Sequence, residues 1–110
     1  MQPPDPSDAK YEVEYKALHA SRPGFRIREM RIGPDQQVPW HCHTTIQDTF
    51  YVLEGRLRIQ LRDPGETLEL GPGETFTVRA PRPHLVTNAG EVSATFFILQ
   101  GIGEYDYVAL

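Results

Sequence analysis

The sequence predicts an all-β fold, a small antiparallel β-barrel or jelly roll, and three observations support this class. Apolar and polar residues alternate with a period of two, for example over residues 57–61. Turn-forming residues recur at intervals of about 8–12 positions, a spacing typical of sandwiches and barrels. The 110-residue chain also contains ten prolines and nine glycines, and these interrupt every longer segment that is compatible with a helix.

The expected elements follow one another from the N-terminus. Residues 1–8 contain three prolines and are predicted to form a flexible arm, whereas residues 9–110 form one β-barrel domain. The first two strands, residues 11–18 and 25–32, are expected to flank a turn at residues 21–24. The later strands are predicted at residues 38–43, 49–53, 57–61, 67–70, 75–79, 84–88, 92–100 and 105–108. Pro- or Gly-containing turns separate most of them, at residues 33–35, 54–55, 63–66, 71–73, 80–83 and 89–91.

Charge and composition exclude several classes of protein. Fifteen acidic and eleven basic residues give a net charge of −4, and the basic residues form no cluster, so neither nucleic acid nor an anionic membrane is an expected partner. No apolar run approaches the roughly 20 residues of a membrane span. The first residues do not resemble a signal peptide, and Cys42 has no second cysteine to pair with, so a cytoplasmic location is expected.

Three histidines form the candidate chemical site. On a strand, residues two apart share a face, so His41 and His43 present their imidazoles side by side while Cys42 points to the other face. His84 lies on a later segment that can pair with the first. Three imidazoles and a nearby carboxylate suit a divalent first-row metal. Taken alone, a His-x-His pair is equally compatible with two surface histidines, and His19 is expected to be solvated.

The spacing around these histidines resembles that of a known family. Four residues separate His43 from Asp48, and six more separate Asp48 from Gly55. A second motif places Gly73, His84 and Asn88 in order. The chain from about residue 33 to residue 88 thus resembles the two motifs of the cupin superfamily. The resemblance implies a small single-domain cupin barrel, a double-stranded β-helix.

The resemblance also implies a ligand set. His41, His43 and His84, with Asp48 as fourth ligand, would hold one divalent transition metal, such as iron, manganese, zinc, nickel or copper. Asp48 replaces the usual glutamate and is one methylene shorter, so it would reach the metal directly or through a water. If it is not a ligand, Asp48 is the best catalytic candidate, as a general base. Gln47 is the alternative fourth ligand.

The strand pattern and the motifs together suggest a largely apolar pocket beside the metal. Arg79 and Pro81 depart from the family pattern, in which proline and glycine are usual, and this places an arginine near the mouth of the barrel. Arg28, Arg79 or Arg82 is expected to supply a cation for a carboxylate or enolate. The predicted pocket residues are Arg28, Phe50, Val52, Phe76, Arg79, Val86 and Asn88.

The expected function is metal-dependent chemistry on a small organic molecule. The metal would act as a Lewis acid or as an oxygen-binding centre. With iron, manganese or copper this implies a dioxygenase, and with zinc or nickel an isomerase, lyase or cyclase. The alternative is a non-catalytic module that binds a small ligand or a metal.

Two segments are apolar on both faces, which predicts a homodimer. Residues 49–53 and 94–99 present one face to the barrel interior, and the other face needs a second cover. That cover is a second subunit or, within one chain, residues 11–18 and 105–110.

Overall fold

The computed structural model describes residues 11–110, and the predicted arm, residues 1–8, lies outside this range. Within the described residues the chain forms ten β-strands and no helix, so none of these residues belongs to a helix able to cross a membrane. The strands are β1 (Tyr15–Arg22), β2 (Phe25–Ile32), β3 (Gln37–Cys42), β4 (Gln47–Glu54), β5 (Leu57–Leu61), β6 (Glu66–Leu70), β7 (Thr75–Val78), β8 (His84–Asn88), β9 (Ala94–Gly101) and β10 (Val108–Ala109).

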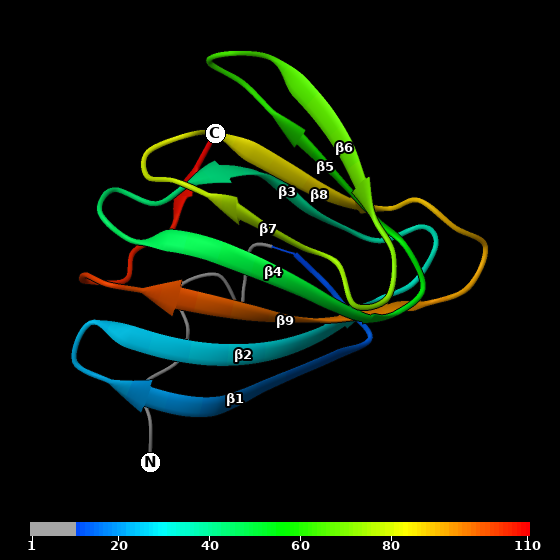
Figure 1. Cartoon of the computed structure of the whole chain (residues 1–110), viewed down its shortest axis with the longest axis horizontal. Coiled ribbons are helices and arrows are strands. Elements are labelled where there is room, and N and C mark those ends of the chain that lie inside the picture. Colours follow the sequence, from blue (N-terminus) through cyan, green and yellow to red (C-terminus); the bar gives the residue numbers. More distant parts are fainter. Residues whose placement is uncertain (1–10) are drawn as a thin grey trace.

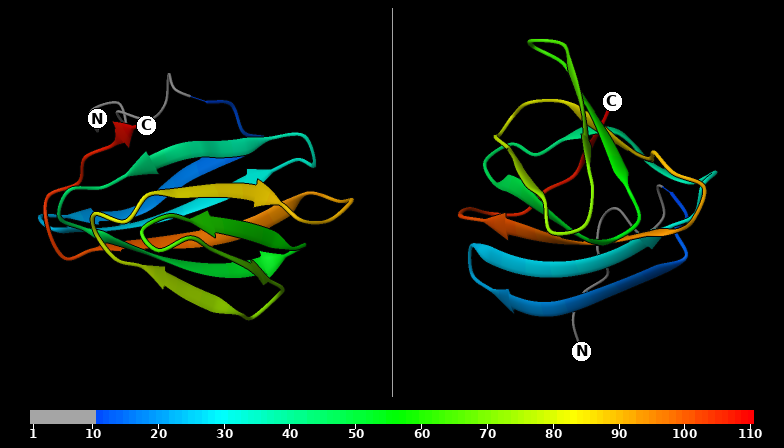
Figure 2. Two further views of the ribbon diagram at one scale, coloured as in Figure 1. Left: turned by 90° about the horizontal axis from the view of Figure 1, so that it is seen from above. Right: turned by 45° about the vertical axis from the view of Figure 1, so that its right-hand side comes forward.

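The strands form two five-stranded antiparallel sheets that enclose one core. Sheet A has the order β1-β2-β9-β4-β7, and sheet B has the order β10-β3-β8-β5-β6. In Figure 1 the strands β1, β2, β9 and β4 run side by side, and sheet B lies beyond them toward the top. Figure 2 shows the same two sheets from two further directions. The chain crosses repeatedly between the sheets, and the predicted all-β jelly roll, a double-stranded β-helix, is confirmed.

The first and last strands differ most from the prediction. β1 begins at Tyr15, four residues later than expected, and continues to Arg22, which pairs with Phe25. The hairpin therefore turns at Pro23 and Gly24, where Gly24 adopts a φ of +80° that suits the third position of a type II turn. The predicted strand at residues 105–108 is also wrong, because only residues 108–109 pair with β3.

The core lies between the inner faces of the two sheets. Alternation along strands such as β5 and β9 buries every second residue, as period-two patterning requires. Phe50 and Phe96 lie near its centre, with ring centroids 6.0 Å apart. The buried core residues are Met30, Ile32, Val38, Phe50, Val52, Leu57, Ile59, Leu61, Leu70, Val78, Val86, Ala94, Phe96 and Ile98.

Gly55 has a packing reason to be glycine. It directly follows β4 and begins the turn to β5 with a φ of +76°, a left-handed conformation that side-chain-bearing residues rarely adopt. A Cβ at this position would lie 2.6 Å from the carbonyl oxygen of Ser93 and 2.8 Å from the Cα of Ala94. The glycine thus allows the turn to press against the start of β9.

The outer face of sheet A carries apolar side chains. Tyr51, Leu53, Phe97 and Leu99, which we call the outer apolar face, alternate with the buried residues of β4 and β9. Three of them are more than one-third exposed. β1 extends the edge of sheet A beside β2, and residues 105–110 lead to β3 in sheet B, so within residues 11–110 neither segment covers this face.

Candidate metal centre

Three histidines and one aspartate converge inside one end of the barrel. His41 lies on β3 and His43 immediately after it, Asp48 lies on β4, and His84 begins β8. One potential ligand atom from each lies within 4.8 Å of all the others. All four side chains are buried, with exposed fractions of 1–3%. The two sheets thus bring together the four residues named from the sequence motifs.

A bulge in β3 gives the first histidine its position. Val38 pairs with Val86 and His41 with His84, so β3 has one more residue than β8 between these pairs. The extra residue lies at Pro39 or its neighbour, where the missing N–H of proline is tolerated because the ladder is already interrupted. As a result His41 faces His84 across the sheet, with ring centroids 4.1 Å apart.

Each imidazole is oriented by a backbone carbonyl. Nδ1 of His41 donates to the carbonyl oxygen of Pro39 (2.8 Å), and Nδ1 of His84 donates to that of Arg82 (3.0 Å). Nδ1 of His43 donates to the carbonyl oxygen of Asp106 (2.5 Å). A carbonyl only accepts, so these bonds place the proton on Nδ1 and turn all three Nε2 atoms toward the centre.

Asp48 completes the cluster from sheet A. Its Oδ2 lies 3.0 Å from Nε2 of His43 and 3.2 Å from Nε2 of His84. Its Oδ1 accepts a hydrogen bond of 3.0 Å from Nε2 of Gln100 on the neighbouring strand β9. The shorter side chain of aspartate therefore reaches the same point as the imidazole nitrogens.

The charges of the cluster complement one another. Burial, reinforced by the neighbouring His84, lowers the pKa of His41 to about 3, so this imidazole is neutral and its Nε2 lone pair is available. Burial works against the charged forms of His43 and Asp48, but their mutual hydrogen bond outweighs it. The pKa of His43 is raised, and the pKa of Asp48 is held well below its usual range.

The donor set fits a divalent first-row metal. Three imidazole nitrogens and one carboxylate oxygen are ligands that zinc, iron, manganese, nickel and copper all accept. The backbone carbonyls that accept from each Nδ1 already hold the imidazoles in place. Gln47 is exposed and lies next to Asp48, on the opposite face of β4. The side-chain placement therefore favours Asp48 over Gln47 as fourth ligand.

Cys42 is not expected to bind the metal. It lies between the two buried histidines and is half-buried, and it is not part of the four-residue cluster. We expect Cys42→Ser to leave the metal content of the purified protein unchanged, measured by elemental analysis at equal loading. A lower metal content in this variant would show that the thiol is a ligand.

A small cavity adjoins the cluster. The space inside it for the centre of a water molecule is about 10 Å³, room for roughly one water. Three of the predicted pocket residues line it, namely Arg28, Phe50 and Val86. Its other lining residues are Tyr11, Val38, His41, His43, Asp48, Ile98, Gln100, Tyr105 and Tyr107.

The other four predicted pocket residues lie elsewhere. Val52 is deeper in the core, and Phe76 packs against the core from β7. Arg79 is exposed and lines a separate surface hollow with residues of the 101–102 segment. Asn88 has a structural role, because its side chain donates to the carbonyl oxygens of Ile32 and Val92.

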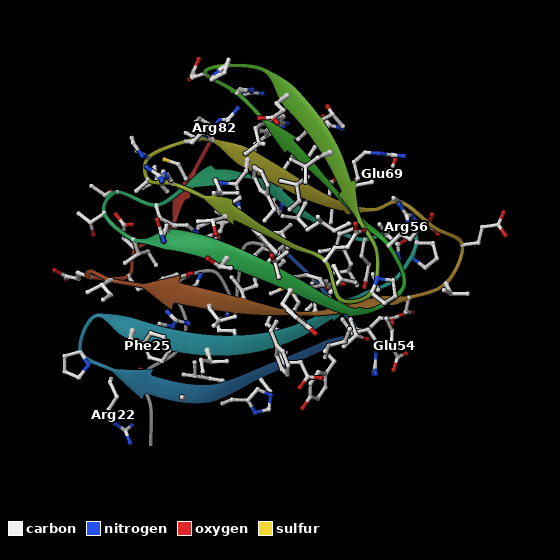
Figure 3. All side chains as sticks on the ribbon, viewed as in Figure 1. Arg22, Phe25, Glu54, Arg56, Glu69 and Arg82 are labelled. Carbon is white, nitrogen blue, oxygen red and sulfur yellow. The ribbon has the colours of Figure 1, made fainter. Side chains whose placement is uncertain are left out.

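Arg82 does not supply a cation to the cavity either. Its guanidinium donates to the carbonyl oxygens of Arg62 (3.0 Å) and Pro64 (2.6 Å) and pairs with Glu66 at 3.1 Å. Figure 3 shows its side chain at the end of the barrel near the β5–β6 turn. Of the three arginines considered from the sequence, Arg28 alone lines the cavity, with an exposed fraction of 5%.

The segment after β9 covers the cavity, which sequence reasoning missed. The ring of Tyr107 stacks on His41 with centroids 4.7 Å apart, and that of Tyr105 lies 5.4 Å from His43. Asp106 holds this segment down, since its carboxylate accepts hydrogen bonds from both the backbone N–H and the hydroxyl of Thr44. We call residues 102–107 the covering segment.

Gln100 was the other residue that the sequence analysis missed. It has the same inward parity on β9 as Ala94, Phe96 and Ile98, so a polar residue continues an apolar face. A polar residue at an inward position of this strand was the signal from which Gln100 could have been assigned to the site.

Two facing antiparallel sheets form a β-barrel that contains, at one end, a buried His-His-Asp-His cluster of the kind that could hold a metal ion. A sequence profile of the cupin domain family (Cupin_2) matches residues 28–100. The chain belongs to the cupin family. No curated protein sequence matches the chain.

Solved structures support the same fold. A conserved protein with a double-stranded β-helix domain from Klebsiella pneumoniae superposes with a TM-score of 0.76 at 18% identity, covering 87% of this chain and 84% of that one. An oxalate oxidase superposes with a TM-score of 0.72 at 18% identity, over 79% of this chain and 46% of that chain. An oxalate decarboxylase from Lactobacillus farciminis gives 0.72 at 16%, over 79% and 27%. The chain therefore spans less than half the length of these two enzymes.

Proposed function

We propose that the protein binds one divalent transition metal through His41, His43, Asp48 and His84. The observation that carries this proposal is the convergence of four buried ligand atoms within 4.8 Å. Buried polar clusters are costly unless each group is satisfied, and here a metal satisfies three Nε2 atoms and one carboxylate oxygen together. The backbone carbonyls that accept from each Nδ1 hold the imidazoles ready for it.

We further propose that the metal centre acts on a small organic acid. When bound, the metal supplies Lewis-acid or oxygen-binding chemistry, which includes the dioxygenase, isomerase, lyase and cyclase classes. Arg28 places a buried positive charge in the same cavity, which attracts a carboxylate. The oxalate enzymes among the structural neighbours act on such an acid, although they are longer chains. If Asp48 is not a metal ligand, it is the candidate general base of the site.

The alternative is a non-catalytic metal-binding module, and one observation favours it. The cavity has room for roughly one water, so a substrate enters only if the covering segment moves. Turnover of small organic acids by the metal-loaded protein would distinguish a catalyst from a module that only holds its metal.

The test of metal binding uses untagged protein stripped with a chelator. We expect elemental analysis after reloading to give about one metal ion per chain. At a free metal concentration of 100 times Kd, binding stabilises the folded state by about 2.7 kcal/mol. For a domain of this size Tm should then rise by roughly 10–20 °C. No uptake and no change in Tm with any of the five candidate metals would contradict the proposal.

We also propose a homodimer that associates through the outer apolar face. Tyr51, Leu53 and Leu99 are 36–39% exposed, so covering the remaining area contributes about 0.5–1 kcal/mol for each side chain. A two-fold interface buries two copies of each, and this sum helps to offset the cost of association. We expect light scattering at micromolar concentration to give about twice the chain mass of 12.5 kDa. Leu99→Glu should shift the mass toward that of one chain, whereas Val92→Glu, an exposed position outside this face, should not. A monomeric wild type would refute the dimer.

A further inference from the structure

Gln100 places an unused hydrogen-bond acceptor inside the cavity. Its side chain is 2% exposed and lies directly opposite Asp48 in the register of β9 and β4. Its Nε2 donates to Oδ1 of Asp48 at 3.0 Å. Because a carboxylate only accepts, this bond fixes which end of the amide faces Asp48 and turns the carbonyl oxygen Oε1 away from it.

Oε1 of Gln100 has no hydrogen-bond partner among residues 11–110. A buried acceptor left unpaired costs stability, and native structures pair nearly all such groups. Gln100 lines the same cavity as His41, His43 and Asp48. A water in the cavity, or a donor that enters with a ligand and displaces it, would pair with this oxygen.

The surroundings restrict the chemistry of that ligand. Asp48 and Gln100 present acceptor oxygens, which favour an O–H donor at this end of the cavity. Arg28 projects from β2, whose register places it opposite Ile98, two residues before Gln100 on β9. The same register places Arg26 opposite Gln100 itself, so two cations of β2 lie along this stretch of β9. A ligand that carries both a carboxylate and a hydroxyl would meet the cation and the acceptor together.

We propose that Oε1 of Gln100 accepts a hydrogen bond from the hydroxyl of a small 2-hydroxy carboxylic acid bound at the metal centre. The proposal rests on the proposed metal function. Gln100 thereby favours carboxylic acids that carry a hydroxyl group over those that carry no hydrogen-bond donor. The acid is larger than one water, so Tyr105 and Tyr107 move aside when it enters.

The test compares glycolate with acetate, which lacks only the hydroxyl. Both are titrated into protein loaded with Co²⁺, and the visible absorption of the metal reports binding without any turnover. The ratio of the affinities of free aqueous Co²⁺ for glycolate and for acetate is the baseline. We expect the wild-type preference to exceed this baseline by roughly three- to tenfold, the net value of one hydrogen bond. Arg28 contacts a carboxylate in either ligand, so its contribution cancels.

Variants then test whether the glycolate preference above the aqueous baseline comes from Gln100. Gln100→Met, which keeps the length of the side chain without an acceptor oxygen, should return the preference to the aqueous baseline while cobalt stays near one per chain. Gln47→Met, at an exposed glutamine beside Asp48, should keep the wild-type preference.

Three results would overturn the assignment. The first is a wild-type preference equal to the aqueous baseline, which decides the matter even if Gln100→Met fails to fold or to hold cobalt. The second is a fully loaded Gln100→Met protein with the wild-type preference. The third is a wild type that takes up neither cobalt nor any of the five candidate metals, and this outcome alone also refutes the proposed metal function.

Discussion

His43→Ala should reduce the bound metal from about one ion per chain to almost none. The imidazole is buried, and its Nε2 lies 3.0 Å from Asp48 at the centre of the cluster. Loss of a residue that only supports a ligand typically costs 10–100-fold in metal affinity, and loss of a ligand itself should cost more than about 100-fold. Elemental analysis after loading at a fixed metal concentration, with circular dichroism to verify folding, measures the effect.

His19→Ala is the matched control. His19 lies on the outer side of sheet A, about half exposed, where its ring pairs with Glu29 at 2.8 Å. The sequence analysis expected a solvated histidine here, and the structure adds two partners, Glu29 and the ring of Phe97, whose centroid lies 5.8 Å away. Its replacement should leave the metal content unchanged. A His43→Ala protein with full metal content would place the site elsewhere.

Phe96→Ala should destabilise the fold by about 3–5 kcal/mol, a large share of the roughly 5–15 kcal/mol that holds a domain together. Phe96 is fully buried on β9, opposite Met30 of β2 and Val52 of β4, and its ring packs on Phe50. Removing the ring leaves a cavity that neighbours on both sides cannot fill without moving the sheet.

Urea denaturation of the metal-free protein measures this loss without a contribution from metal binding. Val92→Ala, at a side chain that is 66% exposed, is the control and should change the free energy of unfolding by less than about 0.5 kcal/mol. A loss below about 1 kcal/mol in Phe96→Ala would mean that the centre of the barrel repacks.

Period-two alternation, together with the spacing of the turns, was enough to predict an all-β sandwich or barrel, because both sheets are buried on one face only. The double-stranded β-helix was predicted from the resemblance to the cupin motifs. The alternation was least informative for the first and last strands of the chain. Residues 11–18 alternate well, but the strand that pairs with β2 is fixed by the Pro23-Gly24 turn, which shifts it toward Arg22. Residues 105–108 also alternate, yet two of them are tyrosines that pack on histidines rather than on a neighbouring strand.

The four-residue cluster was predicted from the resemblance to the two motifs of the cupin superfamily, which gave the positions of Asp48 and His84 as well as the His41–His43 pair. The rest of the site depends on non-local contacts. The carbonyl of Asp106 orients His43 across 63 positions of sequence, and a backbone acceptor can belong to any residue type. The pocket was placed less well, because parity does not show how deep a residue lies, and Val52 was therefore assigned to the pocket instead of the core.

The position of β9 in sheet A has a consequence for folding kinetics. β9 joins β2 to β4, yet its partners on β2 are more than sixty residues away in the sequence. Pairings of such separation close large loops before they gain stability, so we expect refolding in milliseconds to seconds rather than microseconds. Until β9 is in place, β2 and β4 each have an open edge. Those edges are where a newly made chain is most exposed to misassociation with another.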